Sequence, residues 1–378
     1  MRSSLRSAGL AAFLAALLAA VPAGPAGAQA PSAAAPAAQA QERKVVLVTF
    51  DGVRWQDVFR GPDPKVVGDR QFVNPDIKDD VIVPAYMQGA DPGGALMPFL
   101  HGVVGREGVL LGNRDAGECA EVANDMWFSY PGYNEILTGK PDPGILQNDK
   151  IWNPNVSFLE YLQKRPGFRG RVAMVGTWTL FPYIVNTRRS AVPVNEGFGG
   201  SYPTDVKTAR EGLRLLHRHD QRVVYIAFGD TDEFAHAGDY AYYLTALERG
   251  DDFLREVWEL IQTDPFYRGQ TTLIVSTDHG RGDTPLSAWQ DHASKRYFQL
   301  NPDEQPQYNE TGVTGSGNVW IAAIGAAVDR PRAGDYRGGA CAQSRQIAAS
   351  ILTALGEDWR DFRADAGAPL AFIKAPDR

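Results

Sequence analysis

The sequence predicts an α/β fold in which a doubly wound, mostly parallel central sheet carries helices on both faces. Three observations support this prediction. Short runs rich in Val and Ile alternate along the chain with longer amphipathic stretches, an order typical of α/β proteins. The runs show little alternation of polar and apolar residues, as expected for strands that helices cover on both sides. The chain has 378 residues, of which 44% are hydrophobic, enough to bury a large core.

The expected strands follow one another from Lys44 onward. The runs that fit buried, parallel strands are KVVLVTFDG, RVAMVGTW, RVVYIAFGDTD, TTLIVSTDHG and NVWIAAIG. The stretches AYYLTALERGDDFLREVWELIQ and QSRQIAASILTALG have the spacing of amphipathic helices that cover such strands. No internal repeat interrupts this order. We therefore expect one catalytic domain over residues 43–378.

The N-terminal region is expected to lie outside this domain. Residues 1–30 have the features of a secretory signal peptide: two early arginines, an apolar run from about Leu10 to Val21, and A-x-A cleavage candidates at Ala26–Ala28 and Ala28–Ala30. A bilayer span needs roughly 20 residues, so the run is short for the alternative, a retained membrane anchor. Residues 31–42, rich in Pro, Ala and Gln, are expected to form a disordered linker. The sequence thus predicts a periplasmic or secreted protein.

Charge and cysteine content restrict the partners. The formal net charge of −7 gives the chain no general attraction to nucleic acid or to anionic membranes. An anionic substrate would need a local positive site, which bound metal ions would supply. No apolar run after the signal peptide is long enough to span a membrane, and the oligomeric state stays open. Cys119 and Cys341 lie in no CxxC motif, so we expect no thiolate metal site, and in an exported protein they are candidates for a disulfide.

Acidic residues follow three of the predicted strands. Asp51 ends the first run, Asp230 and Asp232 follow the third, and Asp278 follows the fourth. An Asp at a strand end commonly forms a turn or a helix cap, which is the alternative for each residue taken alone. In open α/β sheets, however, ligands bind beyond the carboxyl ends of the strands. We therefore expect these carboxylates to converge at one edge of the sheet.

Three histidines extend this acidic group. His236 lies four residues after Asp232, so on a helix both side chains face the same way and can bind one cation. His279 directly follows Asp278 in a turn where both can face an ion. His292 lies in the polar, loop-like stretch AWQDHA and has the weakest signal. The alternatives are a surface Asp–His pair for His236 and a solvated loop residue for His292.

Ser129 begins the stretch SYPGYNEILTG, in which Pro131 and the apolar residues after it indicate the start of a helix. A serine at such a position is most often only a helix cap. The same position places the hydroxyl beside unpaired backbone N–H groups and the positive end of the helix dipole, where a phosphoryl oxygen binds well. If a metal ion binds the hydroxyl as its alkoxide, Ser129 becomes a nucleophile.

The order of these residues resembles that of the alkaline phosphatase superfamily, in particular its type I phosphodiesterase/nucleotide pyrophosphatase branch and related bacterial phosphatases. The resemblance runs from Lys44 to at least Gly325. Around the nucleophile, the branch has Thr-Phe-Pro-Asn followed by Thr-Gly. SYPGYNEILTG keeps the proline and, at the same spacing, Thr138-Gly139. It departs from the pattern by carrying Ser129 in place of Thr and Gly132 in place of Asn.

The resemblance implies two divalent metal ions at the sheet edge. Zn²⁺ is favoured because the ligands are His and Asp, and Mn²⁺ is the alternative. The implied ligands of one ion are Asp51, Ser129, Asp278 and His279. The implied ligands of the other ion are Asp232, His236 and His292. The family's phosphate-binding Asn corresponds to Asn148 in GILQN.

His292 fits the family pattern less closely than the other ligand positions. In relatives, the late histidine stands shortly before a stretch like GNVWIAAIG. In this chain it lies 26 residues before Asn318 (318 − 292). We interpret residues 293–314 as an insertion.

The resemblance also implies the reaction, hydrolysis of a phosphate ester through a phosphoserine intermediate, and leaves the substrate class open. Monoesters carry an extra negative charge and usually need a cationic partner, for which Arg188 and Arg189 are candidates. The alternative for both is ordinary loop charge. Diesterases instead use an apolar platform, for which the stretch WTLFPY offers Trp178, Phe181 and Tyr183, although such a stretch is more often core.

Other functions fit parts of this pattern. A sulfatase-like enzyme shares the fold and export, but its C/S-x-P-x-R motif requires Arg where this chain has Tyr133. A phosphonate hydrolase on the same fold is a further alternative. A phosphoglycerate mutase shares the metal pattern, but it is cytosolic and has a large inserted domain, which the signal peptide and the short spacing oppose. The alternative outside catalysis is a metal-stabilised binding protein without turnover.

Overall fold

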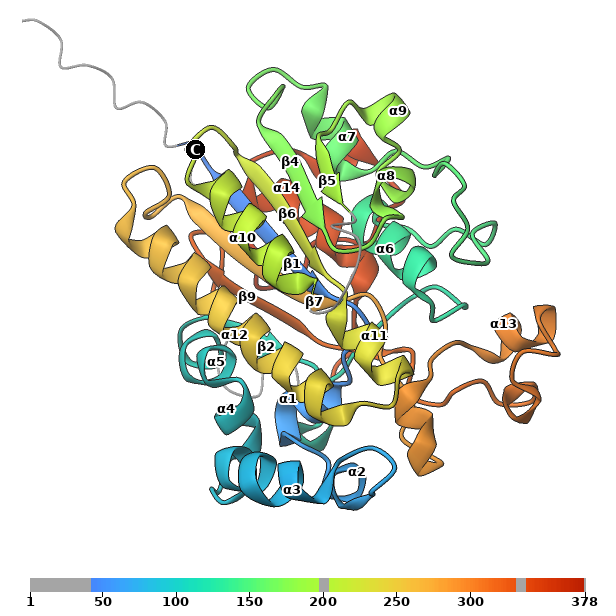
Figure 1. Cartoon of the computed structure of the whole chain (residues 1–378). Helices are drawn as coiled ribbons and strands as arrows, with labels where there is room; N and C mark the ends of the chain where they lie inside the picture. Colours follow the sequence, from blue (N-terminus) through green and yellow to red (C-terminus); the bar gives the residue numbers. More distant parts are fainter. Residues whose placement is uncertain (1–41, 197–203, 331–337, 377–378) are drawn as a thin grey trace, which may run out of the picture. The chain divides into compact units, whose positions relative to one another are not determined.

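The core of the fold is a seven-stranded sheet that consists of β1 (Lys44–Phe50), β2 (Val109–Leu111), β4 (Val172–Gly176), β5 (Val194–Glu196), β6 (Val223–Phe228), β7 (Thr271–Thr277) and β9 (Ile321–Gly325). The strands lie in the order β2–β9–β7–β1–β6–β4–β5 (Figure 1). The run from β7 to β5 is parallel, and β9 is antiparallel to both of its neighbours. This arrangement confirms the predicted mostly parallel sheet.

The computed structural model describes residues 42–196, 204–330 and 338–376. The predicted signal peptide over residues 1–30 therefore lies outside the described residues, as does the predicted linker apart from its last residue. Within the described part of the chain, no helix combines the length and the apolar character that a bilayer span requires.

Helices surround the sheet. The larger ones are α6 (Ser129–Thr138), α10 (Asp205–Leu216), α11 (Asp230–His236), α12 (Tyr240–Thr263) and α14 (Ile347–Ala354). The shorter ones are α1 (Trp55–Arg60), α2 (Pro64–Gly68), α3 (Pro75–Ile77), α4 (Pro92–Leu96), α5 (Gly105–Glu107), α7 (Phe158–Gln163), α8 (Phe181–Ile184), α9 (Thr187–Ser190), α13 (Lys295–Leu300) and α15 (Trp359–Phe362). In Figure 1, α10 and α12 cross the near face of the sheet and α14 lies behind it.

The side chains of β1 show how both faces become buried. Because successive residues of a strand point to opposite faces, Val45 and Leu47 enter one apolar cluster, and Val46 and Val48 enter the other. The first cluster includes residues of α6, α7 and α14, and the second includes residues of α10 and α12. A strand covered on both faces needs an unbroken apolar run, which is the pattern seen in the sequence.

One predicted strand differs from the expectation. NVWIAAIG was expected to form a single parallel strand, and it instead divides into β8 (Asn318–Val319) and the antiparallel β9. The chain leaves the carboxyl end of β7 and makes a long excursion before β9. It therefore re-enters the sheet from the same end and runs in the opposite direction. β8 joins a second, small sheet with β3 (Ala120–Glu121) and β10 (Ala342–Gln343).

A disulfide bond stabilises the small sheet. Cys119 and Cys341, the candidate pair, are bonded, and they directly precede the paired strands β3 and β10. The bond joins positions 222 residues apart in sequence. A cross-link between such distant positions restricts the unfolded chain more than the folded one.

We expect the double variant Cys119→Ser/Cys341→Ser to lose about 2–5 kcal/mol of unfolding free energy, because its unfolded state regains the entropy of a long open loop. Urea unfolding followed by circular dichroism measures this loss. Treatment of the wild-type protein with a reducing agent should shift the transition in the same direction. Unfolding midpoints that coincide for oxidised, reduced and double-variant protein would contradict a stabilising role for the bond.

Candidate active site

The carboxyl ends of three adjacent strands bring three of the four predicted acidic residues together, namely Asp51, Asp232 and Asp278. Asp230 instead accepts hydrogen bonds from the N–H groups of Thr204 and Asp205. Phe50 of β1 is in register with Phe228 of β6 and with Thr277 of β7, so the residues that follow these strands lie at one edge of the sheet. The N–H of Gly52 donates a hydrogen bond to Asp278 Oδ1 over 3.0 Å. A Cβ at Gly52 would lie 2.6 Å from Asp232 Oδ1, and its φ of +60° also favours glycine. The turn after β1 is thus built for close approach of these carboxylates.

The first predicted ligand group surrounds the ring of His279. His279 Nε2 lies 3.3 Å from Asp51 Oδ1 and 3.5 Å from Asp278 Oδ2. The other ring nitrogen, Nδ1, is 2.8 Å from the carbonyl of Gly280, which fixes it as the donor and leaves Nε2 for a ligand. Asp51 Oδ1 and Asp278 Oδ2 are buried and have no hydrogen-bond partner among the described residues. Buried carboxylate oxygens without a donor are the atoms that a metal ion would satisfy.

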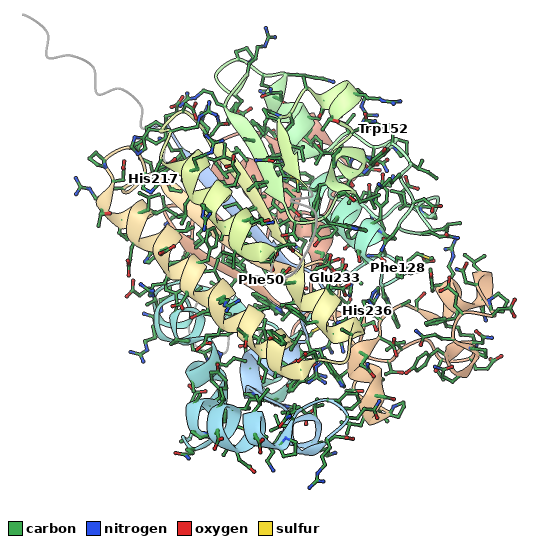
Figure 2. All side chains as sticks on the ribbon, viewed as in Figure 1. Phe50, Phe128, Trp152, His217, Glu233 and His236 are labelled. Atoms are coloured by element: carbon green, nitrogen blue, oxygen red, sulfur yellow. A yellow bond between two sulfur atoms is a disulfide. The ribbon has the colours of Figure 1, made fainter. Side chains whose placement is uncertain are left out.

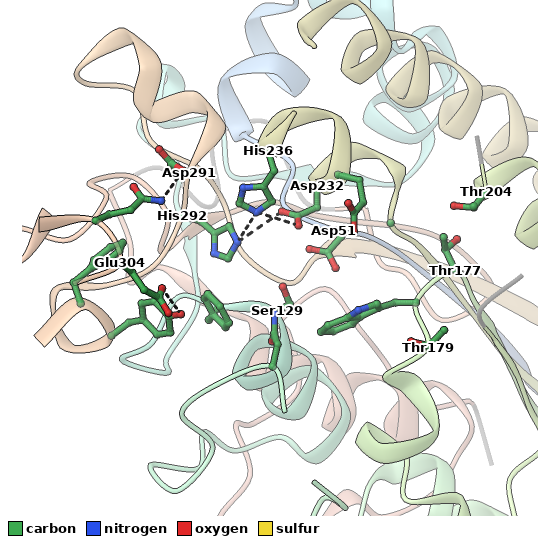
Figure 3. Close-up of a pocket in the computed structure, with 18 residues that line it drawn as sticks. Asp51, Ser129, Thr177, Thr179, Thr204, Asp232, His236, Asp291, His292 and Glu304 are labelled. Atoms are coloured by element: carbon green, nitrogen blue, oxygen red, sulfur yellow. Dashed lines mark hydrogen bonds and ion pairs between the residues drawn. The ribbon is translucent and has the colours of Figure 1, made fainter. Parts of the chain in front are cut away.

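The second predicted ligand group lies on α11 and on the loop before α13. His236 Nε2 is 3.3 Å from Asp232 Oδ2, as expected for residues four apart on a helix. His292 Nε2 lies 3.2 Å from His236 Nε2 and 3.8 Å from Asp232 Oδ1. Figure 3 shows these three side chains facing one another above Ser129. The structure therefore brings the late histidine to the group despite its weak sequence signal.

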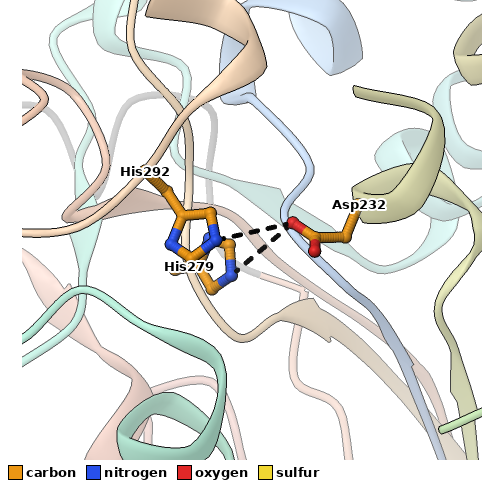
Figure 4. Close-up of side chains that lie close together, drawn as sticks. All are labelled: Asp232, His279 and His292. Carbon is orange, nitrogen blue, oxygen red and sulfur yellow. Dashed lines mark ion pairs between the residues drawn. The ribbon is translucent and has the colours of Figure 1, made fainter. Parts of the chain in front are cut away.

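The two ligand groups are adjacent. The rings of His279 and His292 stack with their centroids 3.9 Å apart (Figure 4), and His279 Nε2 lies 3.9 Å from Asp232 Oδ1. Two clusters of possible ligand atoms result, one formed by Asp51, Asp278 and His279 and the other by Asp232, His279 and His292. The carboxylate and imidazole donors suit Zn²⁺, and carboxylates also suit Mn²⁺. Residues and donor chemistry thus fit two neighbouring divalent ions.

The charges at the site need compensation. Burial raises the pKa of Asp278 well above its ordinary value, and the Asp51 carboxylate raises it further. Burial also raises the pKa of Asp51, with Asp232 as the next cause. Burial alone would lower the pKa of His279, but Asp278 and Asp51 raise it to about 9. Three carboxylates in one buried space repel one another, and divalent cations remove that repulsion.

Ser129 is the first residue of α6, and its hydroxyl faces the first ligand group. Ser129 Oγ lies 3.3 Å from His279 Nε2. The N-cap residue of α6 is Phe128, so Ser129 does not occupy the capping position. A Cβ at Gly132 would lie 2.3 Å from the carbonyl oxygen of Asp278, so only glycine lets α6 pack this closely against the end of β7. Gly132, where the resembling branch has Asn, is therefore required by the packing seen in this chain.

Two further contacts orient residues around Ser129. The hydroxyl of Tyr133 donates a hydrogen bond to Asp51 Oδ2 over 3.0 Å, which leaves Oδ1 free for an ion. Asn148 Oδ1 accepts the N–H of Tyr130 over 2.9 Å, and Asn148 lines the same pocket as Ser129. The Asn148 amide nitrogen makes no hydrogen bond with any residue that the structure describes. It is therefore available to a substrate oxygen.

The predicted cationic partners lie elsewhere. The Arg189 guanidinium donates to the Glu160 carboxylate over 3.0 Å and to the carbonyl of Asn155 over 2.6 Å. The guanidinium of Arg188 lies over the ring of Trp152, 4.3 Å from its centroid. Figure 2 shows Trp152 well apart from His236, and neither arginine lines the pocket. The structure does not bring Arg189 to the site because local partners occupy its donors.

Of the three aromatic residues predicted as an apolar platform for a diester, some also lie away from the pocket. Trp178 lines the pocket beside Ser129. Phe181 is buried in the apolar cluster under the sheet, and Tyr183 packs on Trp152 with ring centroids 4.4 Å apart. Only one of the three aromatic rings is therefore in position to contact a substrate.

Arg281 is a site residue that the sequence analysis missed. Its buried guanidinium donates to the carbonyls of Gly52 and Gln290 and to the Asp232 carboxylate. Burial alone would raise the pKa of Asp232, but Arg281 and His236 hold it well below its usual range. One side chain thus connects three segments that carry predicted ligands. The available signal was a lone basic residue within the acidic stretch DHGRGD, directly after the predicted ligands.

We expect Arg281→Met to weaken binding at the second metal site about 10–100-fold, because residues that orient a ligand contribute that much to metal affinity. Arg281→Lys keeps the positive charge but loses the planar guanidinium that bonds several acceptors at once. It should therefore retain only part of the wild-type zinc affinity. Competition with a chromophoric chelator measures the zinc affinity, and circular dichroism checks folding. The matched control is Arg296→Met, which removes an exposed arginine paired with Asp125. Equal zinc affinity in Arg281→Met and wild-type protein would contradict this role.

A pocket of about 480 Å³ opens at the two ligand groups (Figure 3). Its lining residues are Asp51, Phe128, Ser129, Asn148, Thr177, Trp178, Thr179, Thr204, Gly229, Asp232, Glu233, His236, Asp291, His292, Tyr297, Phe298, Glu304 and Gln305. In Figure 3, Ser129 lies between Glu304 on one side of the pocket and Thr177 and Thr179 on the other. The pocket can therefore hold groups on both sides of a reacting centre.

Comparison with known proteins identifies relatives of this fold. The family model described as the metalloenzyme superfamily matches residues 183–293, a stretch that includes five of the predicted ligands. The lipoteichoic acid synthase LtaP from Listeria monocytogenes is similar in structure, with a TM-score of 0.53 and 10% sequence identity over 84% of this chain and 73% of that one. An inactive form of murine ectonucleotide pyrophosphatase/phosphodiesterase 5 in complex with AMP has a TM-score of 0.50 and 12% identity over 83% of this chain and 95% of that one. No curated protein matches the sequence.

Proposed function

We propose that this chain is a metalloenzyme of the alkaline phosphatase superfamily and that it hydrolyses phosphate esters with Ser129 as its nucleophile and two divalent ions as cofactors. The observation that carries the proposal is the position of the Ser129 hydroxyl, 3.3 Å from His279 Nε2 and beside two groups of carboxylates and imidazoles. A structural serine would not need such surroundings. Hydrolysis of phosphate esters does need a nucleophile beside concentrated positive charge.

The residues have separate tasks in this mechanism. Two divalent ions, held by Asp51, Asp278 and His279 and by Asp232, His236 and His292, would stabilise the charge on the attacking and leaving oxygens. Ser129 Oγ attacks phosphorus, the bond to the leaving alcohol breaks, and a phosphoserine forms. Water then attacks the same phosphorus, releases phosphate or its monoester, and restores the hydroxyl. The Asn148 amide nitrogen and the backbone N–H of Ser129, the first residue of α6, hold the non-bridging oxygens.

The charge of the pocket favours a phosphodiester over a monoester. Among the residues that the structure describes, no Lys or Arg lines the pocket. The acidic residues Glu233, Asp291 and Glu304 line it outside the ligand groups. A monoester carries a second negative charge, which this lining would repel, whereas a diester carries one charge and two organic groups. The two sides of the pocket offer a place for each group.

Two p-nitrophenyl substrates test the proposal. We expect the metal-loaded protein to hydrolyse bis(p-nitrophenyl) phosphate with a higher kcat/KM than p-nitrophenyl phosphate. The opposite order would assign the chain to the monoesterases. Release from neither substrate by protein that contains both ions would favour the alternative of a metal-binding protein without turnover. p-Nitrocatechol sulfate is the control for sulfatase activity, and we expect no release because Tyr133 occupies the position of the sulfatase arginine.

Location is part of the same proposal. We propose that residues 1–30 direct export and are then removed, so that the enzyme acts in the periplasm or outside the cell. The bond between Cys119 and Cys341 supports this location, because disulfides persist in oxidising compartments.

A further inference from the structure

One wall of the pocket comes largely from the predicted insertion and the residues beside it. We name this surface the insertion wall and define it by Phe128, Asp291, Tyr297, Phe298, Glu304 and Gln305, all of which line the pocket. The insertion is anchored beside the nucleophile, since Ser294 Oγ donates to the carbonyl of Asp125 over 2.6 Å and its N–H donates to the carbonyl of Met126. α13 and the segment after it (orange in Figure 1) thus contribute directly to the active-site pocket.

The insertion wall presents stacked aromatic rings next to a predicted metal ligand. The rings of Phe128 and Tyr297 stack with their centroids 4.5 Å apart and an interplanar angle of 21°. The Phe128 ring also lies 4.9 Å from the ring of His292. Phe128 directly precedes Ser129 in the chain, so the aromatic surface begins beside the nucleophile. A group esterified to the reacting phosphorus would contact these rings.

The same wall holds two oriented carboxylates. The Tyr297 hydroxyl donates to Glu304 Oε2 over 2.8 Å, and Gln305 Nε2 donates to Asp291 Oδ1 over 3.0 Å. Burial raises the pKa of Tyr297 well above its ordinary value, and the Glu304 carboxylate contributes to the rise, so the hydroxyl remains a donor. Neutral donors fix the direction of each carboxylate without cancelling its charge.

No cation within the described residues neutralises these two carboxylates. The insertion contains Lys295 and Arg296, but Lys295 pairs with Glu310 at 3.1 Å and Arg296 pairs with Asp125. Neither basic residue lines the pocket. The basic side chains of the insertion are therefore directed to other partners, whereas Glu304 of the insertion and Asp291 just before it line the substrate pocket.

We propose that the insertion wall binds the positively charged end of an alcohol esterified to the substrate phosphate, such as an ammonium group. This proposal rests on the proposed function, because it assigns one of the two organic groups of the phosphodiester. An ammonium group gains from an aromatic face and from the nearby carboxylates of Glu304 and Asp291. A neutral aromatic group, such as a nucleobase, would use the rings but gain nothing from Glu304 and Asp291.

A matched pair of diesters separates charge from size. The first substrate is p-nitrophenyl phosphorylcholine, and the second is p-nitrophenyl 3,3-dimethylbutyl phosphate, in which carbon replaces the charged nitrogen. We expect kcat/KM for the charged substrate to be at least about tenfold higher, the size of effect that one partly desolvated cation–π contact with an added ion pair provides. Phosphorus NMR counts hydrolysis at either ester bond, so the result does not depend on which alcohol leaves.

Single substitutions locate the source of the preference. In Glu304→Gln, which alters an exposed side chain, we expect the ratio of the two kcat/KM values to fall severalfold toward unity. Asp291→Asn should lower the ratio in the same way. The matched control is Glu310→Gln, an exposed acid of the same insertion that pairs with Lys295 outside the pocket, and its ratio should equal that of the wild type.

The outcomes distinguish the two proposals. If bis(p-nitrophenyl) phosphate is hydrolysed but the charged and neutral diesters react equally, the cation site is wrong and the proposed function stands. If the ratio of the two kcat/KM values stays high in both Glu304→Gln and Asp291→Asn, the cation site is also wrong. If no diester is hydrolysed, the proposed function fails, and calorimetric titration of Ser129→Ala with choline and 3,3-dimethylbutanol decides the binding site alone. Choline must then bind more tightly than its neutral analogue, and equal binding would overturn the proposal.

Discussion

Replacing Ser129 with alanine is expected to reduce hydrolysis of bis(p-nitrophenyl) phosphate by roughly three orders of magnitude or more. The substitution removes the oxygen that lies 3.3 Å from His279 Nε2 and leaves the carboxylates and imidazoles in place. Both metal sites should persist with reduced affinity at the first. The loss should therefore fall on kcat rather than on folding, which thermal unfolding of the variant checks.

Two further variants sharpen this test. Ser129→Thr keeps a hydroxyl and matches the residue of the resembling branch, so it should retain measurable activity. Ser287→Ala removes an exposed serine near the site and should behave as the wild type. Rapid quenching of the wild-type reaction should trap phosphate on Ser129, in a yield that Ser129→Ala abolishes. Activity of Ser129→Ala close to that of the wild type would contradict the assignment of the nucleophile.

Removal of metal is expected to have an effect of similar size. Dialysis against a strong chelator should lower kcat/KM by at least about a hundredfold, and added Zn²⁺ or Mn²⁺ should restore it. The physical reason is the crowding of Asp51 and Asp278, each of which has a buried carboxylate oxygen without a hydrogen-bond partner among the described residues. Thermal unfolding should also shift to lower temperature in the metal-free protein, because cations that bind the folded state stabilise it.

The metal requirement can be assigned to individual ligands. Asp278→Asn keeps the shape of the side chain and removes its charge, so it should lower the number of ions bound per chain. Asp283→Asn is the matched control, because Asp283 is an exposed acid in the same loop that belongs to neither ligand group. Full activity in protein that elemental analysis shows to be free of metal would contradict the two-ion mechanism.

The sequence was sufficient to predict the sheet and most of the residues that gather at its edge, because both depend on local patterns. A parallel strand buried on both faces requires an unbroken apolar run, and a ligand at a strand end requires a polar residue directly after that run. Asp51, Asp278 and His279 satisfy this rule. His236 follows Asp232 at helical spacing, which is again a local pattern.

Features that depend on distant segments could not be predicted in the same way. The direction of β9 follows from the long excursion after β7, which carries no directional signal in NVWIAAIG. Arg281 contacts segments near residues 52, 232 and 290, and no spacing rule links such positions. The basic pair at positions 188 and 189 looked like a substrate partner, but local carbonyls and Glu160 occupy the donors of Arg189.

The most direct test of the central proposal is the location of metal ions in crystals grown with Zn²⁺ and measured at the zinc absorption edge. The two-ion mechanism predicts two anomalous peaks per chain, roughly 4 Å apart. One peak should lie among Asp51, Asp278, His279 and the Ser129 hydroxyl, and the other among Asp232, His236 and His292. An absence of peaks at these groups, or zinc bound only at other residues, would contradict it.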